Sequence, residues 1–214
     1  MDKNEILIAG FAALVVMMAW GLQRLSRKFP DKARGEGRSL FPLWVAQGFG
    51  AGQIPRAPGT FGSVVGLGWF ALLVWSQNWV VLGAGIVLSF PLSVWLCGEA
   101  EVTMGEKDPG PVVIDEVAAI PVCFVAWAWI ATVNTGGLPG PGYFYSQSNW
   151  PLALGVFALF RFFDVVKPWP VRQSQSLPGG WGVTVDDFLA AVYVNLVVVG
   201  VWFGHTAWSR SSGE

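Results

Sequence analysis

Six apolar runs are the feature that most restricts what this chain can fold into. Their limits are approximately 6–22, 64–76, 79–97, 117–133, 151–166 and 188–204. A run of roughly 20 apolar residues crosses the hydrocarbon core of a bilayer as a helix. Apolar residues make up 53% of the chain and the mean hydropathy is +0.51, which favours an integral membrane protein over a soluble one. We therefore predict an all-α, polytopic membrane bundle of about six membrane helices.

Two of these runs are short for a span. The run 64–76 is well below the usual length, and the run 151–166 soon meets charged residues. We expect both helices to be tilted, partly interfacial or extended by neighbouring residues.

The distribution of basic residues predicts the orientation. Basic residues follow the first run instead of preceding it, which favours a membrane anchor over a signal peptide. Alternate threading places 23–63, 98–116 and 167–187 on the cytoplasmic side, with Arg161 and Asp164 in the cytoplasmic last turns of the fifth run. Eleven of the thirteen Lys and Arg residues then lie inside. This distribution satisfies the positive-inside rule.

Charge and cysteine content exclude several classes of protein. A net charge of −1 gives no general attraction to nucleic acid. Cys97 and Cys123 both lie in apolar runs and are expected to be buried thiols, not members of a disulfide framework. His205 is the single histidine, is expected at the outer surface and is set aside as a base, so a zinc or other soft-metal site is not indicated.

Charged residues concentrate in the segment 160–187, although only 13% of the chain is charged. Ionised groups beside hydrocarbon are rare unless they pair, face water or take part in chemistry. The segment contains three acids and three bases, and 112–116 adds two further acids. The acids are Asp115, Glu116, Asp164, Asp186 and Asp187, and the bases are Arg161, Lys167 and Arg172.

These acids predict a site for a hard cation. The threading places all five on the cytoplasmic side, where carboxylates repel one another unless a cation compensates them. Oxygen ligands without His or Cys favour Mg2+. The simpler alternative is helix capping: each acidic pair begins an apolar run, and Thr184 with Asp187 resembles a capping box.

Three charged residues step by three along the end of one predicted helix. Arg161, Asp164 and Lys167 therefore share one broad face, and Pro168 and Pro170 end the helix. The two cations suit a phosphate ester held beside Mg2+. Snorkelling cations with a neutralising acid are the alternative.

The segment RAPGTFGS, residues 56–63, precedes the second apolar run. Its Pro-Gly pair predicts a turn, and Thr60 or Ser63 is expected to cap the following helix. With Arg56, the exposed N–H groups would cradle a phosphate, although a plain N-cap explains the segment equally well. Gly62 and Gly66 indicate close helix packing.

Two further segments carry weaker signals. Glu99, Glu101 and Asp108 are expected as solvated loop acids, with the latter two the main candidates for a different role. The uncharged segment 134–150 predicts an interfacial loop without chemistry.

Four segments occur together in a familiar order. IPRAPGTFGS, DPGPVVIDE, FRFFDVVKPWP and GGWGVTVDD resemble the phosphatidylglycerophosphatase A family over approximately residues 41–200. Two positions differ from the family pattern, because Ala119 and Ala191 stand where glycine is expected.

The resemblance implies a bacterial inner-membrane, Mg2+-dependent phosphatase that converts phosphatidylglycerophosphate to phosphatidylglycerol. Three regions follow: an anchor with a basic linker (1–40), a membrane catalytic domain (41–205) and a tail (206–214). The phospholipid substrate lies in the bilayer, and the active site faces the cytoplasm. The implied metal and catalytic residues are the five acids, and the implied substrate-binding residues are Arg56, Thr60, Ser63, Arg161, Lys167 and Arg172.

Several alternatives remain open at this point. Direct hydrolysis and a phospho-aspartate route both suit the acids. A divalent-cation transporter or channel also places acids between membrane helices, usually near the bilayer midplane. A lipid-binding scaffold would keep the pocket without turnover. Sequence does not decide the number of metal ions or the oligomeric state.

Overall fold

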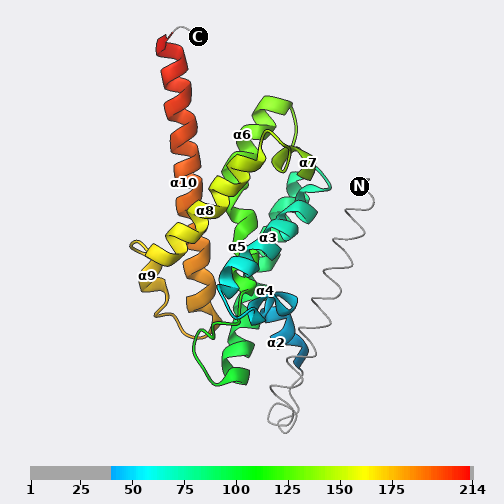
Figure 1. Ribbon diagram of the computed structural model, residues 1–214, viewed down its shortest axis with the longest axis vertical. Helices are drawn as coiled ribbons and strands as arrows, with labels where there is room; N and C mark the ends of the chain where they lie inside the picture. The colour runs from blue at the N-terminus through cyan, green and yellow to red at the C-terminus, as the bar shows by residue number, and fades with distance from the viewer. Residues whose placement is uncertain (1–39, 213–214) are drawn as a thin grey trace.

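A computed structural model describes residues 40–212, and these residues form helices and connecting loops without any strand (Figure 1). The first apolar run and most of its basic linker lie outside the described residues. The helices are α2 (Leu40–Ala46), η1 (Gly48–Gln53), α3 (Pro58–Val74), α4 (Trp79–Met104), α5 (Ile114–Cys123), α6 (Val125–Thr135), α7 (Pro141–Phe144), α8 (Trp150–Val166), α9 (Val171–Ser174) and α10 (Gly180–Ser212).

Three helical segments among the described residues are long and apolar enough to cross a membrane. They are α4 with 26 residues, α5 and α6 together with 22, and α10 with 33. The helices α3 and α8 occupy predicted apolar runs, but each has 17 residues. Such a helix is about 25 Å long, shorter than the ~30 Å hydrocarbon core. The all-helical membrane fold is therefore confirmed, while the count of six spans stays a prediction.

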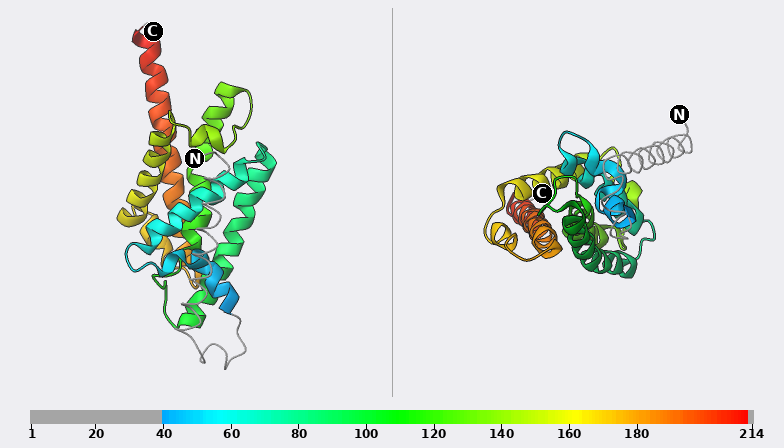
Figure 2. Two further views of the ribbon diagram at one scale, coloured as in Figure 1. Left: turned by 45° about the vertical axis from the view of Figure 1, so that its right-hand side comes forward. Right: turned by 90° about the horizontal axis from the view of Figure 1, so that it is seen from below.

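Helix α5 occupies the centre of the bundle, with α3, α4 and α10 packed against it (Figures 1 and 2). Its residues Ala118, Ala119 and Ile120 are almost fully buried. Helix α10 starts beside the other helices and then projects past them toward the C terminus (Figure 1). A central helix surrounded by neighbours must be apolar on most sides, as the sequence of α5 is.

Glycines allow α3 to approach α5 closely, as predicted. A Cβ atom on Gly66 would lie 2.7 Å from Ile120 Cγ1, and one on Gly62 would lie 2.5 Å from Val113 Cβ. No side chain fits at these distances, so the backbone of α3 lies directly against side chains at and just before α5. The expected close packing through Gly62 and Gly66 is confirmed.

The uncharged segment 134–150 contributes to the core as well as to the surface. Its short helix α7 carries Phe144, which is fully buried. The Phe144 ring lies 5.0 Å from that of Phe70 and 5.1 Å from that of Trp127, both with edge-to-face geometry. Aromatic packing of this kind adds to the stability gained from burial. The two cysteines, Cys97 and Cys123, are buried free thiols, as predicted.

Three helix ends converge at one end of the bundle. They are the start of α5, the last turns of α8 and the first turns of α10, all remote from the C terminus (Figure 1). These are the segments that carry the five predicted acids.

Candidate active site

A chain of alternating charges joins the three converging helices. Arg161 Nη1 lies 2.9 Å from Glu116 Oε1 and 3.0 Å from Asp164 Oδ2. Lys167 Nζ lies 2.5 Å from Asp186 Oδ2 and 3.9 Å from Asp164 Oδ1. The charges therefore alternate in the order Glu116, Arg161, Asp164, Lys167, Asp186, from α5 through α8 to α10.

The backbone at the end of α8 directs Lys167 toward this chain. Lys167 adopts a left-handed conformation with φ of 47° and donates its backbone N–H to Phe163. Pro168 follows and cannot continue the helix, as predicted. Burial lowers the pKa of the Lys167 ammonium, but the hydrogen bond to Asp186 and the nearby carboxylate charges together raise it by more. The pKa therefore lies above its ordinary value. Lys167 is therefore a cation at neutral pH.

Asp115 and Asp187 are both buried, with exposed fractions of 6% and 3%. Among the neighbouring charges, that of Asp115 acts most strongly on Asp187, so the two carboxylates lie near each other. Three buried carboxylate oxygens in the described chain have no hydrogen-bond partner: Asp115 Oδ1, Glu116 Oε2 and Asp187 Oδ2. Burying a carboxylate oxygen without a hydrogen-bond partner costs free energy, and oxygens left in this state commonly bind an ion or another ligand.

The donor chemistry of these oxygens suits Mg2+, which prefers carboxylates and water. Among residues 40–212, however, no three His, Cys, Asp or Glu side chains are grouped as a ready-made metal site. Asp164 and Asp186 instead use oxygens to pair with the two cations. Mg2+ commonly takes only one or two protein carboxylates and completes its shell with water and phosphate. The residues fit an ion shared with a phosphate better than an ion enclosed by protein.

The start of α3 forms one wall of the site. A Cβ atom on Gly59 would lie 2.1 Å from Glu116 Oε1 and 3.0 Å from Arg161 Nη2. Ser63 Oγ accepts a hydrogen bond of 3.5 Å from Arg161 Nη1 and donates to the carbonyl of Gly59. The glycine backbone therefore lies directly on the Glu116–Arg161 pair.

Comparison with known proteins assigns the site to a family. The sequence profile of phosphatidylglycerophosphatase A matches residues 44–202, which include every residue of the site. The chain belongs to the phosphatidylglycerophosphatase A family. Members of this family are named as phosphatases, and the apolar helices make this member a membrane protein.

Curated relatives support the family assignment. The phosphatidylglycerophosphatase A of Haemophilus influenzae is 34% identical over 74% of this chain and 87% of its own length. That of Escherichia coli is 30% identical over 69% of this chain and 76% of its own length. A Bacteroides thetaiotaomicron protein, provisionally named phosphatidylinositol-3-phosphatase, is 34% identical over 77% of this chain and 96% of its own. No solved structure matches the chain.

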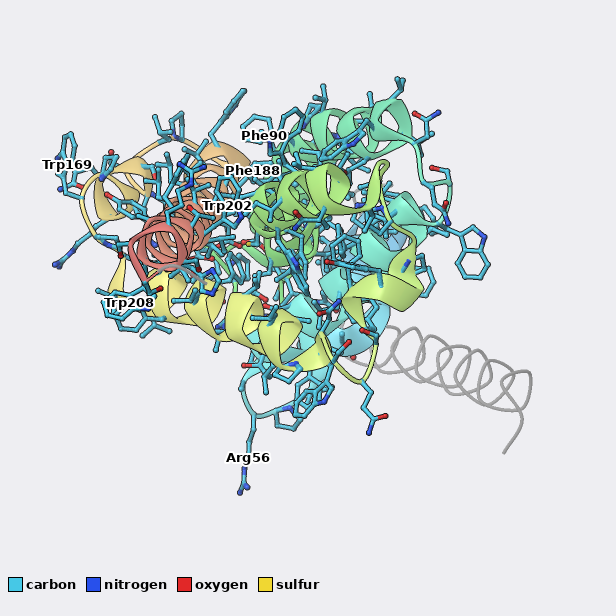
Figure 3. All side chains as sticks on the ribbon, turned by 90° about the horizontal axis from the view of Figure 1, so that it is seen from above. Arg56, Phe90, Trp169, Phe188, Trp202 and Trp208 are labelled. Carbon is cyan, nitrogen blue, oxygen red and sulfur yellow. The ribbon has the colours of Figure 1, made fainter. Side chains whose placement is uncertain are left out.

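Within this phosphatidylglycerophosphatase A fold, the structure brings together eight of the eleven predicted site residues. The two that lie apart most clearly are cations. Arg56 is exposed and points away from the helices (Figure 3), and Arg172 is exposed on α9. Thr60 lies at the start of α3, half-buried, without a described side-chain hydrogen bond. The residues brought together are Asp115, Glu116, Asp164, Asp186, Asp187, Arg161, Lys167 and Ser63.

Two predictions about helix capping are wrong. Helix α3 begins at Pro58 after Ala57, without a side-chain cap, so neither Thr60 nor Ser63 is its N-cap. Thr184 is not the start of a capping box, because α10 already begins at Gly180. Thr184 is fully buried and its hydroxyl lies 3.0 Å from that of Ser93 on α4. Asp115 and Glu116 do lie in the first turn of α5, so they complement its dipole in addition to any chemistry.

The predicted loop acids divide into two groups. Glu99 and Glu101 lie within α4, not in a loop, because the helix extends to Met104. Asp108 is an exposed loop residue whose backbone N–H donates to Glu101 Oε1 at 3.0 Å. Its charge reaches Asp115 and Glu116, so this loop contributes to the electrostatics of the site.

The sequence interpretation missed the role of Gly59 and the partnership of Ser93 with Thr184. A signal for Gly59 was present, because Gly59, Gly62 and Gly66 repeat at helical spacing on one face. No comparable signal indicates Ser93, since a hydroxyl in an apolar run commonly bonds within its own helix.

Proposed function

We propose that this chain hydrolyses the terminal phosphomonoester of phosphatidylglycerophosphate to phosphatidylglycerol and inorganic phosphate, with Mg2+ as cofactor. The observation that carries the proposal is the position of three unpartnered, buried carboxylate oxygens beside Arg161 and Lys167 at one end of a membrane bundle. Family membership supports the same reaction.

Asp115, Glu116 and Asp187 would hold the metal, because their free oxygens need a cation. Asp164 and Asp186 complete the acidic set and also orient the two basic residues. When bound, Mg2+ would supply neutralisation of the phosphate charge and polarisation of the phosphoryl oxygens.

Arg161 and Lys167 would bind the nonbridging phosphate oxygens. Both side chains are about one quarter exposed, at 23% and 24%, so they can reach a ligand that arrives from the aqueous edge. The ion pairs of Arg161 use Nη1, and a guanidinium has further donors for a phosphate. Neutralising the transferring phosphoryl group is the principal task in this kind of reaction.

The surface of α8 suits a substrate that stays in the bilayer. Phe162, Val165 and Val166 are all more than half exposed and lie next to the charged residues of the same helix. An apolar surface beside a phosphate site would let acyl chains remain in lipid while the headgroup meets the acids. We place this site at the cytoplasmic face of the bacterial inner membrane, in agreement with the distribution of Lys and Arg.

A carboxylate of the acidic set would act as base toward water or as nucleophile toward phosphorus. Trapping of a phosphorylated enzyme separates these routes. An acid-stable phospho-aspartate would establish the covalent route, whereas uptake of one solvent oxygen into phosphate without such an adduct would establish direct hydrolysis.

The test of the function is phosphate release from phosphatidylglycerophosphate by purified protein in detergent, with Mg2+ and with EDTA. Asp164→Asn and Asp187→Asn are assayed in parallel with the unaltered chain. Release that requires Mg2+ and is lost in both variants is the expected result. Phosphatidylinositol 3-phosphate serves as a second substrate, because one relative is provisionally named for it. Absence of release from folded protein on both lipids would overturn the proposal and favour a cation transporter or a lipid-binding scaffold.

A further inference from the structure

The central membrane segment is interrupted between α5 and α6. Helix α5 ends at Cys123 and α6 begins at Val125, with Phe124 between them at φ −91° and ψ −4°. Pro121 precedes the interruption and has no N–H to donate. The Phe124 N–H donates to the carbonyl of Pro121, at 3.3 Å, instead of continuing the regular pattern.

The side-chain amide of Asn195 on α10 enters this interruption. Asn195 Oδ1 accepts a hydrogen bond of 2.7 Å from the backbone N–H of Ala126. Asn195 Nδ2 donates to the carbonyls of Val122 and Ala191, each at 2.8 Å. In an uninterrupted helix the Ala126 N–H would bond to the Val122 carbonyl itself. One amide from α10 thus stands between two backbone groups of the neighbouring segment.

These contacts fix the position of α5 along α10. Both backbone groups lie in a segment long enough to span the membrane, where an unpaired N–H or carbonyl is costly. A slip of α10 by one turn, about 5.4 Å, would break both hydrogen bonds. The core between the acidic pairs and these hydrogen bonds includes Ala119 and Ala191, which are fully buried. Alanine side chains are too small to hold the two helices in register as strongly as the Asn195 hydrogen bonds do.

The same two helices carry both acidic pairs. Asn195 follows Asp187 by eight residues, or about 12 Å along α10, and Val122 follows Glu116 by six, or about 9 Å along α5. The spacing between the two acidic pairs therefore depends on the alignment of α5 with α10. We propose that Asn195 is a positioning residue, which sets the distance between the acids of α5 and those of α10 without touching the substrate. This inference rests on the proposed phosphatase function for its kinetic part only.

The structural test uses crosslinking and does not depend on activity. Asp115 and Asp187 are replaced by cysteine in a chain in which Cys97 and Cys123 are serine. Disulfide formation between the introduced pair is then compared with and without Asn195→Leu. We expect the substitution to slow crosslinking at least fivefold. An unchanged rate would overturn the proposal.

The kinetic test uses Asn195→Leu and Asn195→Asp in the otherwise unaltered chain. Asn195→Asp keeps an acceptor for the Ala126 N–H, so it provides a second variant where the leucine does not fold. Tyr145→Phe is the matched control, since it removes another interhelical bond, from the Tyr145 hydroxyl to the Leu67 carbonyl, away from α10. We expect kcat to fall at least tenfold for the Asn195 variants with KM within twofold, and both constants to be kept in the control.

The outcomes distinguish the two proposals. Equal losses in the Asn195 and Tyr145 variants, in proportion to lost thermal stability, would overturn the positioning role. If the unaltered chain releases no phosphate while the cysteine-substituted chains show the crosslinking difference, the phosphatase function is overturned and the role of Asn195 stays intact.

Discussion

Lys167 Nζ lies 2.5 Å from Asp186 Oδ2, so the residue that caps the C-terminal end of α8 is bound to the second turn of α10. Asp186 is only 3% exposed, whereas the lysine side chain is one quarter exposed. The pair closes one end of a charge chain whose other end is Glu116 on α5. Three helices that are distant in sequence are therefore joined by ionic contacts at the proposed site.

Replacing Lys167 with methionine is expected to damage both activity and stability. The change leaves Asp186 buried without its cation, which should lower the free energy of unfolding by about 1–3 kcal/mol. Loss of a phosphate-binding cation should lower kcat/KM about a hundredfold. Arg210→Met, at the exposed far end of α10, removes the same charge and should change neither quantity. Phosphate-release kinetics and thermal unfolding check this, and equal effects in the two variants would contradict it.

Arg161 is expected to be irreplaceable by lysine. Its Nη1 contacts acids on two different helices, Glu116 on α5 and Asp164 on α8. An ammonium lacks the planar fork that makes several directed contacts from one group. Arg161→Lys should therefore lose about tenfold or more in kcat/KM although the charge is kept. A lysine variant with unaltered kinetics would show that only charge is required at this position.

The location of the helices was predictable because burial in lipid requires apolar runs, and the described runs all became helices. The convergence of the acids was also predictable, since alternate threading places their segments at one side. The number of spans was not, because α3 and α8 are too short to cross alone and their tilt depends on neighbours. The spacing of Arg161, Asp164 and Lys167 predicted a shared face, and the structure brings the three together. Arg56 was expected at the same site but points away from the helices (Figure 3).

Other details depend on contacts between distant segments and leave little trace in local sequence. Thr184 has the spacing of a capping box, yet its hydroxyl bonds to Ser93, 91 residues away. The backbone N–H of Ala126, beside the interruption at Phe124, bonds to Asn195, 69 residues further along the chain. At both positions the hydrogen-bond partner lies on another helix, where local sequence does not indicate it.

Gly59→Ala is expected to disrupt the site through a single methyl group. The new Cβ would lie 2.1 Å from Glu116 Oε1, so the Glu116–Arg161 pair or the start of α3 must move. A displacement near 1 Å in a catalytic arrangement costs about a hundredfold in rate. Gly68→Ala is the matched control in the same helix, because a Cβ atom there would have no heavy atom of a neighbouring residue within 4 Å. Phosphate release should fall in the first variant only, and equal rates would contradict the close contact.

Asp187→Asn is expected to stabilise the metal-free protein while removing its activity. Asp187 is buried, its Oδ2 has no hydrogen-bond partner, and it lies among other carboxylates, so its charge is unfavourable without a cation. A neutral amide of the same shape removes that cost, and the gain in EDTA should be about 1 kcal/mol or more. Thermal unfolding with and without Mg2+ checks this. The unaltered chain should be stabilised by Mg2+ and the variant much less, because a ligand stabilises only the state that binds it.

Glu106→Gln, an exposed loop substitution with the same change of charge, should leave both the EDTA stability and the Mg2+ response unchanged. A variant less stable than the unaltered chain in EDTA would show that the Asp187 carboxylate serves the fold and not a metal.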